Sequence, residues 1–311
     1  MVTDAKPRIA ITMGDPCGIG PEVVAKTLAS EEIHHDCLPV VIGNSWVMEQ
    51  AVRLAKVNLQ VRKVQNVNGV GELSAFIDVL DTDNLNPEDI VIGNVVPACG
   101  KAAMEWVAKA AELALSGEID AICTAPINKE SATLAGYKTV GHMELLQQVS
   151  HAPQVATMLM SGRLRVVHLT THRSLRAACG YVTKERILAS LELTHREFGG
   201  WGMPNPLIGV AALNPHASDG GLLGSEEAEQ IGPAIEDARR DGIDAYGPVP
   251  ADIIFHQAIQ GAYDVTLAMY HDQGHIPVKV YGFERSVTAN LGLPFVRTSV
   301  DHGTAFDIAG K

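Results

Sequence analysis

The sequence lacks the features that mark disulfide-rich, membrane-spanning and nucleic-acid-binding proteins. Its five cysteines are scattered and form no CxxC pair, which argues against a disulfide framework or a thiolate zinc motif. The longest apolar runs are near strand length and fall short of the roughly 20 residues that a membrane helix needs. Lys and Arg number 24 against 36 Asp and Glu, without a basic run, so nucleic acid is not an expected partner. The N-terminus has no basic-then-apolar leader, and we expect a cytoplasmic protein.

The residues that are present predict a folded α/β protein. Apolar residues make up 46% of the chain and charged residues 19%, which suffices for a hydrophobic core. The length of 311 residues suggests about two domains. Helices are expected from Pro21 and over 101–116, 183–198 and 225–240. Strands are expected over 8–13, 39–43, 90–95, 119–124, 165–170, 207–213 and 265–270. Because most of these strands are apolar without alternation, we expect a mostly parallel sheet.

Three of the 12 histidines follow predicted strands. The segments RVVHLTTH, LIGVAALNPH and VTLAMYH end at His172, His216 and His271. Ligands of open α/β sheets bind beyond the carboxyl ends of the strands, so these imidazoles could share one divalent cation with positions left for substrate. Structural or hydrogen-bonding roles are the alternative, because the spacing matches no local metal motif.

Three cations stand in segments that are otherwise apolar or follow a strand. Lys279 and Arg297 lie in IPVKVYGF and PFVRTS, and Lys129 lies in TAPINKE. Arg suits bidentate binding of phosphate or carboxylate, and Lys supplies a point charge. The alternative is a charge that reaches the surface or forms an internal salt bridge.

A glycine-rich segment, residues 14–22, lies between a predicted strand and a predicted helix. An anion-binding loop and a tight structural turn are both compatible with this position. The spacing is neither GxGxxG nor GxxxxGK[ST], so no nucleotide-binding motif is met. The cluster GHME, residues 141–144, is a weaker candidate, since such pairs are often surface features.

Together these segments resemble the 4-hydroxythreonine-4-phosphate dehydrogenase family, NAD-dependent enzymes of pyridoxal phosphate synthesis. The stretches that carry the resemblance are ITMGDPCGIGPE, TAPINKE, GHMELL, TTHRSLR, LNPHASDGG with GSEEAE, GPVPADIIF, MYHDQGHIPVK and LGLPFVRTSVDHGTAFDIAGK. The last is also similar to the HGSAPDIAG segment of isopropylmalate dehydrogenases. The resemblance implies their two-domain fold, with mostly parallel sheets, an interdomain cleft and no GxGxxG. We expect a discontinuous first domain, 1–127 with 265–311, and a second, 128–264, that carries metal ligands and dimer contacts.

The resemblance also implies the composition of the active site. One divalent metal is expected on His172, His216 and His271, with ligands shared between two subunits of a homodimer at whose interface the site lies. Zinc is the first expectation, with magnesium, manganese or cobalt as alternatives, and NAD is expected before NADP. His302 and Gly303 are expected near the nucleotide. Substrate contacts are expected from His142, Met143, Lys279, Thr288, Asn290 and Arg297. The proton-transfer group is open among Lys279, Asp252 and Asp272.

The implied reaction is oxidation of a phosphorylated 3-hydroxy acid, followed by decarboxylation. The best guess for the substrate is 4-phosphohydroxy-L-threonine. Two departures from the family pattern affect that assignment: Met143 replaces the Thr of GHTE, and VTANLGLP replaces VNITLGLP, with Thr288 and Asn290 on one side of an extended segment. The alternatives are 4-phospho-D-threonate or 4-phospho-D-erythronate as substrate, or a non-catalytic paralogue that binds a metal or phosphometabolite.

Overall fold

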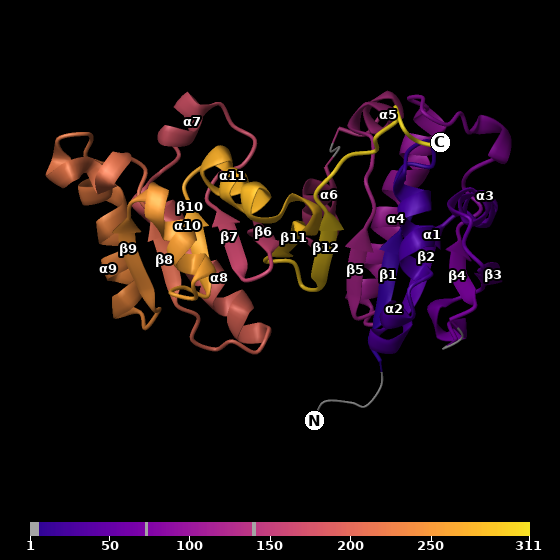
Figure 1. Ribbon diagram of the computed structural model, residues 1–311, viewed down its shortest axis with the longest axis horizontal. Coiled ribbons are helices and arrows are strands. Elements are labelled where there is room, and N and C mark those ends of the chain that lie inside the picture. Colours follow the sequence, from indigo (N-terminus) through magenta and orange to yellow (C-terminus); the bar gives the residue numbers. More distant parts are fainter. Residues whose placement is uncertain (1–5, 72–73, 139–140) are drawn as a thin grey trace. The chain divides into compact units, whose positions relative to one another are not determined.

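The computed structural model describes residues 6–71, 74–138 and 141–311, which form two compact units (Figure 1). Unit 1 contains the described residues up to Pro153 and the segment Leu293–Lys311, and unit 2 contains Gln154–Gly292. A discontinuous first unit was expected, but the bounds differ. Residues 265–292 belong to unit 2 because their strands pair with strands of that unit. Residues 128–153 belong to unit 1 because their helices pack on a long helix there.

The sheet of unit 1 is parallel throughout. Its order is β3 (Gln60–Val64), β4 (Phe76–Asp81), β2 (Leu38–Gly43), β1 (Arg8–Thr12), β5 (Ala121–Thr124) and β12 (Val296–Val300). Every pair in this order that has a described register is parallel. The apolar sequence of β2 fits a strand that is covered on both faces.

The helices of unit 1 begin where the sequence provides starting signals. They are α1 (Gly20–Leu28), α2 (Glu31–Asp36), α3 (Ser45–Ala55), α4 (Pro97–Leu115), α5 (Lys129–Leu134) and α6 (His142–Ser150), with short 3₁₀ turns η1 (Val67–Gly69) and η2 (Pro87–Asp89). α1 and α4 have proline in their first turn. α4 packs on β1, β2 and β5 and buries Trp106, whose Nε1 donates a hydrogen bond to Thr82 Oγ1 at 2.9 Å.

The strand expected over 90–95 is absent, and this prediction was wrong. The segment is a loop in which Gly93 has a φ of +76°, a left-handed conformation that interrupts extended structure. The amide of Gly93 donates to the carbonyl of Cys17 at 2.8 Å instead of to a neighbouring strand. Ile90 and Ile92 line a surface cavity, which explains an apolar run outside the sheet.

Unit 2 has a mixed sheet. Its order is β11 (Val287–Leu291), β6 (Ala156–Ser161), β7 (Leu164–His168), β10 (Val265–Ala268), β8 (Ile208–Ala211) and β9 (Ala245–Val249). β6 pairs antiparallel with both β11 and β7, and the other pairs are parallel. The predicted strand at 165–170 therefore exists as β7, and the antiparallel neighbours were not expected.

Helices cover the two faces of the unit 2 sheet. They are α7 (Leu175–Cys179), α8 (Lys184–Gly200), α9 (Gly232–Arg240), α10 (Ala251–Ile259) and α11 (His271–Gly282), with the short turns η3 (Pro215–Gly221), η4 (Glu227–Ile231) and η5 (Phe283–Arg285). α8 and α9 share one hydrophobic cluster with the sheet, and α10 and α11 share another. Figure 1 shows α11 beside β7 and β10. Across the described part of the chain, no helix combines the length and apolar character that crossing a bilayer requires.

Candidate active site

Polar residues gather beyond the carboxyl ends of three parallel strands of unit 2. β10 lies between β7 and β8, and its last residue, Ala268, is paired with His168 at the end of β7. His172 follows β7, His271 is the first residue of α11 after β10, and His216 lies in η3 after β8. The fold therefore places the three predicted metal ligands on segments that leave one sheet edge.

The start of α11 is held close to the sheet by buried contacts. The side chain of Gln273 accepts a hydrogen bond from the Met269 amide and donates one to the Ala212 carbonyl, each at 2.7 Å. A Cβ atom at Gly274 would lie 2.3 Å from Nε2 of His168, so only glycine allows this approach. These contacts fix where the first turn of α11 presents His271.

His172 and His271 lie beside one another. Their ring centroids are 5.8 Å apart, and both rings line a cavity of about 330 Å³ that also contains Asp272 and Tyr270. Nδ1 of His271 lies 2.7 Å from Oδ1 of Asp272. Because an ionised carboxylate only accepts hydrogen bonds, this contact puts the proton on Nδ1 and leaves the lone pair of His271 on Nε2. That tautomer suits a metal ligand.

His216 has the same kind of carboxylate partner but lies apart. Its Nδ1 is 3.2 Å from Oδ2 of Asp219, and the four residues from His216 to Asp219 all have left-handed φ values between 46° and 67°. His216 does not line the cavity that contains His172 and His271. Within the described residues, the ligand atoms of the three histidines do not gather within 4.8 Å of one another. One chain therefore brings two of the predicted ligands together and holds the third elsewhere.

Two further histidines, which the sequence did not single out as site residues, adjoin this pair. The ring of His275 stacks on His271 with centroids 3.7 Å apart, and His168 lies 4.5 Å from His275. Burial, followed by the charge of His275, lowers the pKa of His168 from 6.5 to about 3. The spacing of His271 and His275, one helical turn apart, was a signal for this contact.

Lys279 continues the same face of α11. It lines a second cavity of about 350 Å³ together with His271, Asp272 and His275, and its Nζ lies 5.2 Å from the ring centroid of Phe283. His271, His275 and Lys279 are spaced four residues apart, which places them along one side of the helix. By contrast, Asp252 is exposed in the first turn of α10 and lines neither cavity.

A second polar group lies in unit 1, around Arg297 of β12. The Arg297 side chain is buried, and its Nη2 donates to Oγ1 of Thr124 at 2.5 Å. Burial lowers the pKa of Arg297 to about 10, and burial together with the charge of Arg297 holds the pKa of His142 well below 6.5. Lys129 lowers the pKa of His142 further. A buried guanidinium beside a neutral imidazole is suited to binding an anion. The half-buried Met143 follows His142 at the start of α6.

The remaining predicted substrate residues lie on β11. Thr288 and Asn290 share one side of that strand, while Ala289 and Leu291 belong to the hydrophobic cluster on the other side. Asn290 is paired across the strands with Thr157, whose carbonyl lies 3.4 Å from Nδ1 of His168. The same-side arrangement of Thr288 and Asn290 is as expected.

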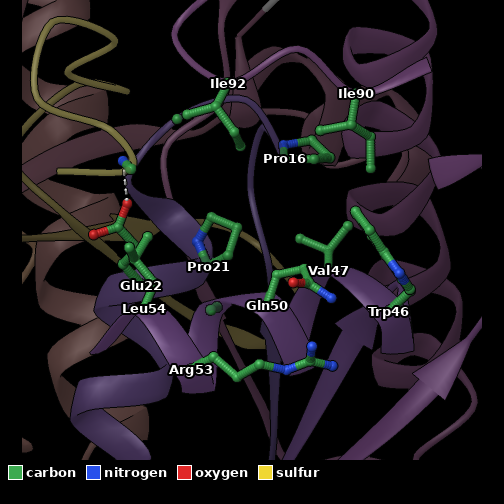
Figure 2. A pocket seen from close by; sticks show the side chains of 13 residues that line it. Pro16, Pro21, Glu22, Trp46, Val47, Gln50, Arg53, Leu54, Ile90 and Ile92 are labelled. Carbon is green, nitrogen blue, oxygen red and sulfur yellow. Dashed lines mark hydrogen bonds between the residues drawn. The ribbon is translucent and has the colours of Figure 1, made fainter. Parts of the chain in front are cut away.

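The predicted nucleotide residues, His302 and Gly303, lie in an exposed loop after β12. Nδ1 of His302 contacts the carbonyl of Gly303 at 2.9 Å. Neither residue lines the cavity of about 550 Å³ in unit 1, where Figure 2 shows mainly apolar side chains around Gln50 and Arg53. Pro16, Pro21 and Glu22 of the glycine-rich segment line part of this cavity.

The geometry of the glycine-rich loop favours the structural-turn alternative. Gly14 has a φ of +77°, and a Cβ there would lie 2.4 Å from the carbonyl oxygen of Pro126. Oδ1 of Asp15 accepts a hydrogen bond from the Cys17 amide at 2.9 Å. Because the Cys17 amide already donates to this carboxylate, the loop has fewer free N–H groups for binding an anion than an uncapped helix N-terminus has.

Known proteins match this chain over nearly its whole length. A family model described as pyridoxal phosphate biosynthetic protein PdxA matches residues 35–311. A Geobacter metallireducens protein named 4-hydroxythreonine-4-phosphate dehydrogenase is 44% identical over 307 residues, which are 99% of this chain and 91% of that protein. A Fusobacterium nucleatum protein provisionally named D-threonate 4-phosphate dehydrogenase is 45% identical over 304 residues, which are 98% of this chain and 91% of that protein.

Solved structures agree with these matches. The crystal structure of 4-hydroxythreonine-4-phosphate dehydrogenase from Klebsiella pneumoniae has a TM-score of 0.92 and 39% identity, covering 99% of this chain and 94% of that one. These findings confirm the α/β fold class and the family resemblance. The chain therefore belongs to the PdxA family of dehydrogenases.

Proposed function

We propose that this chain oxidises the hydroxyl group of a phosphorylated 3-hydroxy acid with NAD and a divalent metal, and then decarboxylates the product. The observation that carries the proposal is the pairing of His271 with Asp272 and of His216 with Asp219. A carboxylate on Nδ1 is the usual second partner of a metal-binding imidazole. Two of three predicted ligands have it, so the residues fit a metal. The metal would be zinc first, with magnesium, manganese or cobalt as alternatives.

The predicted site residues of unit 2 divide into metal ligands and candidates for proton transfer. His172, His216 and His271 would hold the metal, which when bound would act as a Lewis acid on the substrate's alcohol. Lys279 is the best of the three proton-transfer candidates, because it lines a cavity next to His271. Asp272 is engaged with His271 and would act as a positioning residue, and Asp252 lies outside both cavities.

Arg297 would bind the phosphate, which is remote from the reacting carbon. Its guanidinium is buried yet charged, and an arginine can bind a phosphate through two parallel hydrogen bonds. His142 and Lys129 lie in the same electrostatic environment. Binding energy gained at the phosphate would orient the acid for reaction. His302 and Gly303 are proposed to lie near the nucleotide.

The separation of His216 from the other two ligands supports a metal site built by two chains. We propose a homodimer in which His216 of one subunit completes the site formed by His172 and His271 of the other. In this arrangement no ligand needs to move across the unit to complete the metal site. The left-handed backbone at His216 is the kind of strained conformation that is often found at functional sites.

The candidate substrates are the amino acid 4-phosphohydroxy-L-threonine and two hydroxy acids, 4-phospho-D-threonate and 4-phospho-D-erythronate. 4-Phosphohydroxy-L-threonine carries an amino group, and 4-phospho-D-threonate carries a hydroxyl in its place. Names of relatives support both. Met143 favours the second candidate, because a thioether offers no hydroxyl to hydrogen-bond an ammonium group.

The test is NADH production by the metal-replete protein with 4-phosphohydroxy-L-threonine, 4-phospho-D-threonate, 4-phospho-D-erythronate and their unphosphorylated forms. We expect turnover of phosphorylated acids only, with NADP as a second cofactor to compare. Turnover of unphosphorylated acids at equal rates would contradict the role of Arg297. Binding of a phosphorylated acid without NADH formation would instead identify a non-catalytic paralogue and overturn the proposed activity.

A further inference from the structure

A second cluster of ligand-type side chains lies in unit 1, whereas the predicted histidine ligands belong to unit 2. It consists of Asp15 and Cys17, in the loop between β1 and α1, and Cys99, in the first turn of α4. All three side chains are completely buried, and the two sulfur atoms are 3.4 Å apart. Within the described residues, this is the one group of three or more potential metal ligands whose ligand atoms lie within 4.8 Å of one another.

One oxygen of the buried Asp15 carboxylate makes no direct hydrogen bond by distance and angle among the described residues. Oδ1 accepts a hydrogen bond from the Cys17 amide, whereas Oδ2 is buried and, among the described residues, has no hydrogen-bond partner. The buried hydroxyl of Ser131 lies beside the same carboxylate, and its interaction with that carboxylate lowers the pKa of Asp15. Burial raises the pKa of Asp15 to about 6. Because an unpaired buried carboxylate oxygen is costly, the cluster calls for a cation or a donor.

We propose that Asp15, Cys17 and Cys99 form a binding site for a thiophilic divalent cation such as Zn²⁺. Two thiolates and one carboxylate are ligands that zinc accepts in tetrahedral sites. Zinc–sulfur bonds of about 2.3 Å in that geometry place the sulfurs about 3.8 Å apart, so the observed 3.4 Å requires only a small adjustment. The hydroxyl of Ser131 or a water molecule would supply the fourth ligand.

The bound site would carry one net negative charge. Binding releases the two thiol protons to solvent, and the resulting thiolates with the carboxylate carry three negative charges against the two positive charges of the ion. The contact between the two thiols lowers the pKa of Cys17 and raises the pKa of Cys99, so Cys17 is the first of the pair to lose its proton. A disulfide would use the same two sulfurs but would bring no positive charge to the buried carboxylate of Asp15, which is why the metal is the better occupant.

The ion would fix the glycine-rich loop to the start of α4. Cys17 and Cys99 are 82 positions apart in the sequence, and their contact closes that stretch of chain. The site lies wholly in unit 1, so it is independent of the metal proposed for the active site. Its role would be to stabilise the loop that precedes α1.

The experiment uses Co²⁺ as the probe. The full-length protein is reduced, stripped of metal with a chelator, and titrated with Co²⁺ while the thiolate-to-cobalt charge-transfer absorption is followed. We expect this band to reach its maximum at one thiolate-bound ion per chain and to disappear when Zn²⁺ is added. The His271→Ala variant should keep the band, which separates this site from the proposed active site.

Variants assign the band to the cluster. Cys17→Ser and Cys99→Ser should each lose it, and Cys37→Ser and Cys179→Ser are the matched controls that should keep it. Asp15→Asn leaves both thiols in place and should weaken Zn²⁺ binding, which tests the carboxylate even if a cysteine variant folds poorly. Absence of the band in the unaltered protein, or its survival in both cluster variants, would overturn the proposal. So would an intact mass that reveals a Cys17–Cys99 disulfide in the protein as purified.

Discussion

Nδ1 of His271 lies 2.7 Å from Oδ1 of Asp272, the next residue in the chain. This contact fixes the tautomer of the ring at the first position of α11, where the lone pair on Nε2 can coordinate a metal. We therefore expect Asp272→Ala to lower the affinity of the active site for its divalent ion by about 10–100-fold.

The affinity can be measured by competition with a chromophoric chelator. Asp241→Ala removes an exposed carboxylate at the end of α9 and is the matched control. Equal metal affinities of the Asp272 variant and the control would show that Asp272 does not support a metal ligand.

His216→Ala should abolish turnover and sharply reduce metal content while the circular dichroism spectrum stays unchanged. The residue lies in an exposed turn, so its loss leaves no cavity in the core. The control is His256→Ala, which removes an exposed histidine of α10. Normal activity of the His216 variant would exclude it as a ligand.

Mixing subunits tests whether the site is shared. A heterodimer of His216→Ala and His271→Ala chains would hold one intact site if His216 acts across the interface, and none if all ligands come from one chain. We expect inactive variants to regain activity after co-refolding, up to about half of the unaltered rate per heterodimer. Two inactive variants that remain inactive as a verified heterodimer would refute the shared site.

The sequence predicted the parts of this fold and site that depend on local patterns. Apolar runs correctly predicted the positions of β1, β2 and β7. The placement of histidines after the predicted strands correctly indicated that they follow β7, β8 and β10. The prediction of a strand at 90–95 was wrong because apolar residues can line a cavity as well as belong to a sheet. The left-handed conformation of Gly93 is incompatible with an extended strand, and Ile90 and Ile92 line the cavity instead.

Contacts between distant segments could not be predicted in this way. His168 and Gly274 are close only because α11 returns over β7, and no local pattern carries that information. The same holds for Cys17 and Cys99, whose spacing in sequence argued against a thiolate site. The domain bounds differed because strand pairing, which assigns β10 and β11 to unit 2, is also a long-range property.

His168 should make the stability of the metal-free protein depend on pH. Its pKa is about 3 in the folded chain against 6.5 as the ordinary value, so below pH 6.5 the unfolded chain binds a proton that the folded chain does not. The contribution of His168 to the free energy of unfolding is fully present above pH 6.5. It decreases as the pH falls toward 3, by up to about 1.4 kcal/mol per pH unit.

His168→Asn should remove this contribution and flatten the slope relative to the unaltered protein. Urea unfolding at a series of pH values between about 4.5 and 6.5, with chelator present, measures the difference. Asp15 acts in the opposite direction, because a carboxyl group whose pKa is raised to about 6 by folding stabilises the protein at low pH. The unaltered protein and the His168→Asn variant share that effect, so it cancels in the comparison. Parallel slopes would contradict a neutral, buried His168.

Arg297→Lys should raise the KM for the phosphorylated substrate by about 10–100-fold, because a lysine cannot replace paired hydrogen bonds to a phosphate. The metal content should not change, since the predicted metal ligands lie in unit 2 and Arg297 lies in unit 1. Arg196→Lys alters an exposed arginine of α8 and is the control. An unchanged KM with loss of metal would assign Arg297 to folding instead of phosphate binding.

Met143→Thr should change which acid the protein prefers. Met143 follows His142, whose pKa is lowered by burial and by Arg297, and it stands where the family pattern GHTE has a threonine hydroxyl. A hydrogen bond that the charged amino group donates to that hydroxyl oxygen is worth enough to raise kcat/KM for 4-phosphohydroxy-L-threonine, relative to 4-phospho-D-threonate, by about tenfold or more. The ratio of the two kcat/KM values measures this directly, with Met160→Thr on β6 as a control outside that group. An unchanged ratio would mean that discrimination between the two acids lies elsewhere, with Thr288 and Asn290 of β11 as the next positions to exchange.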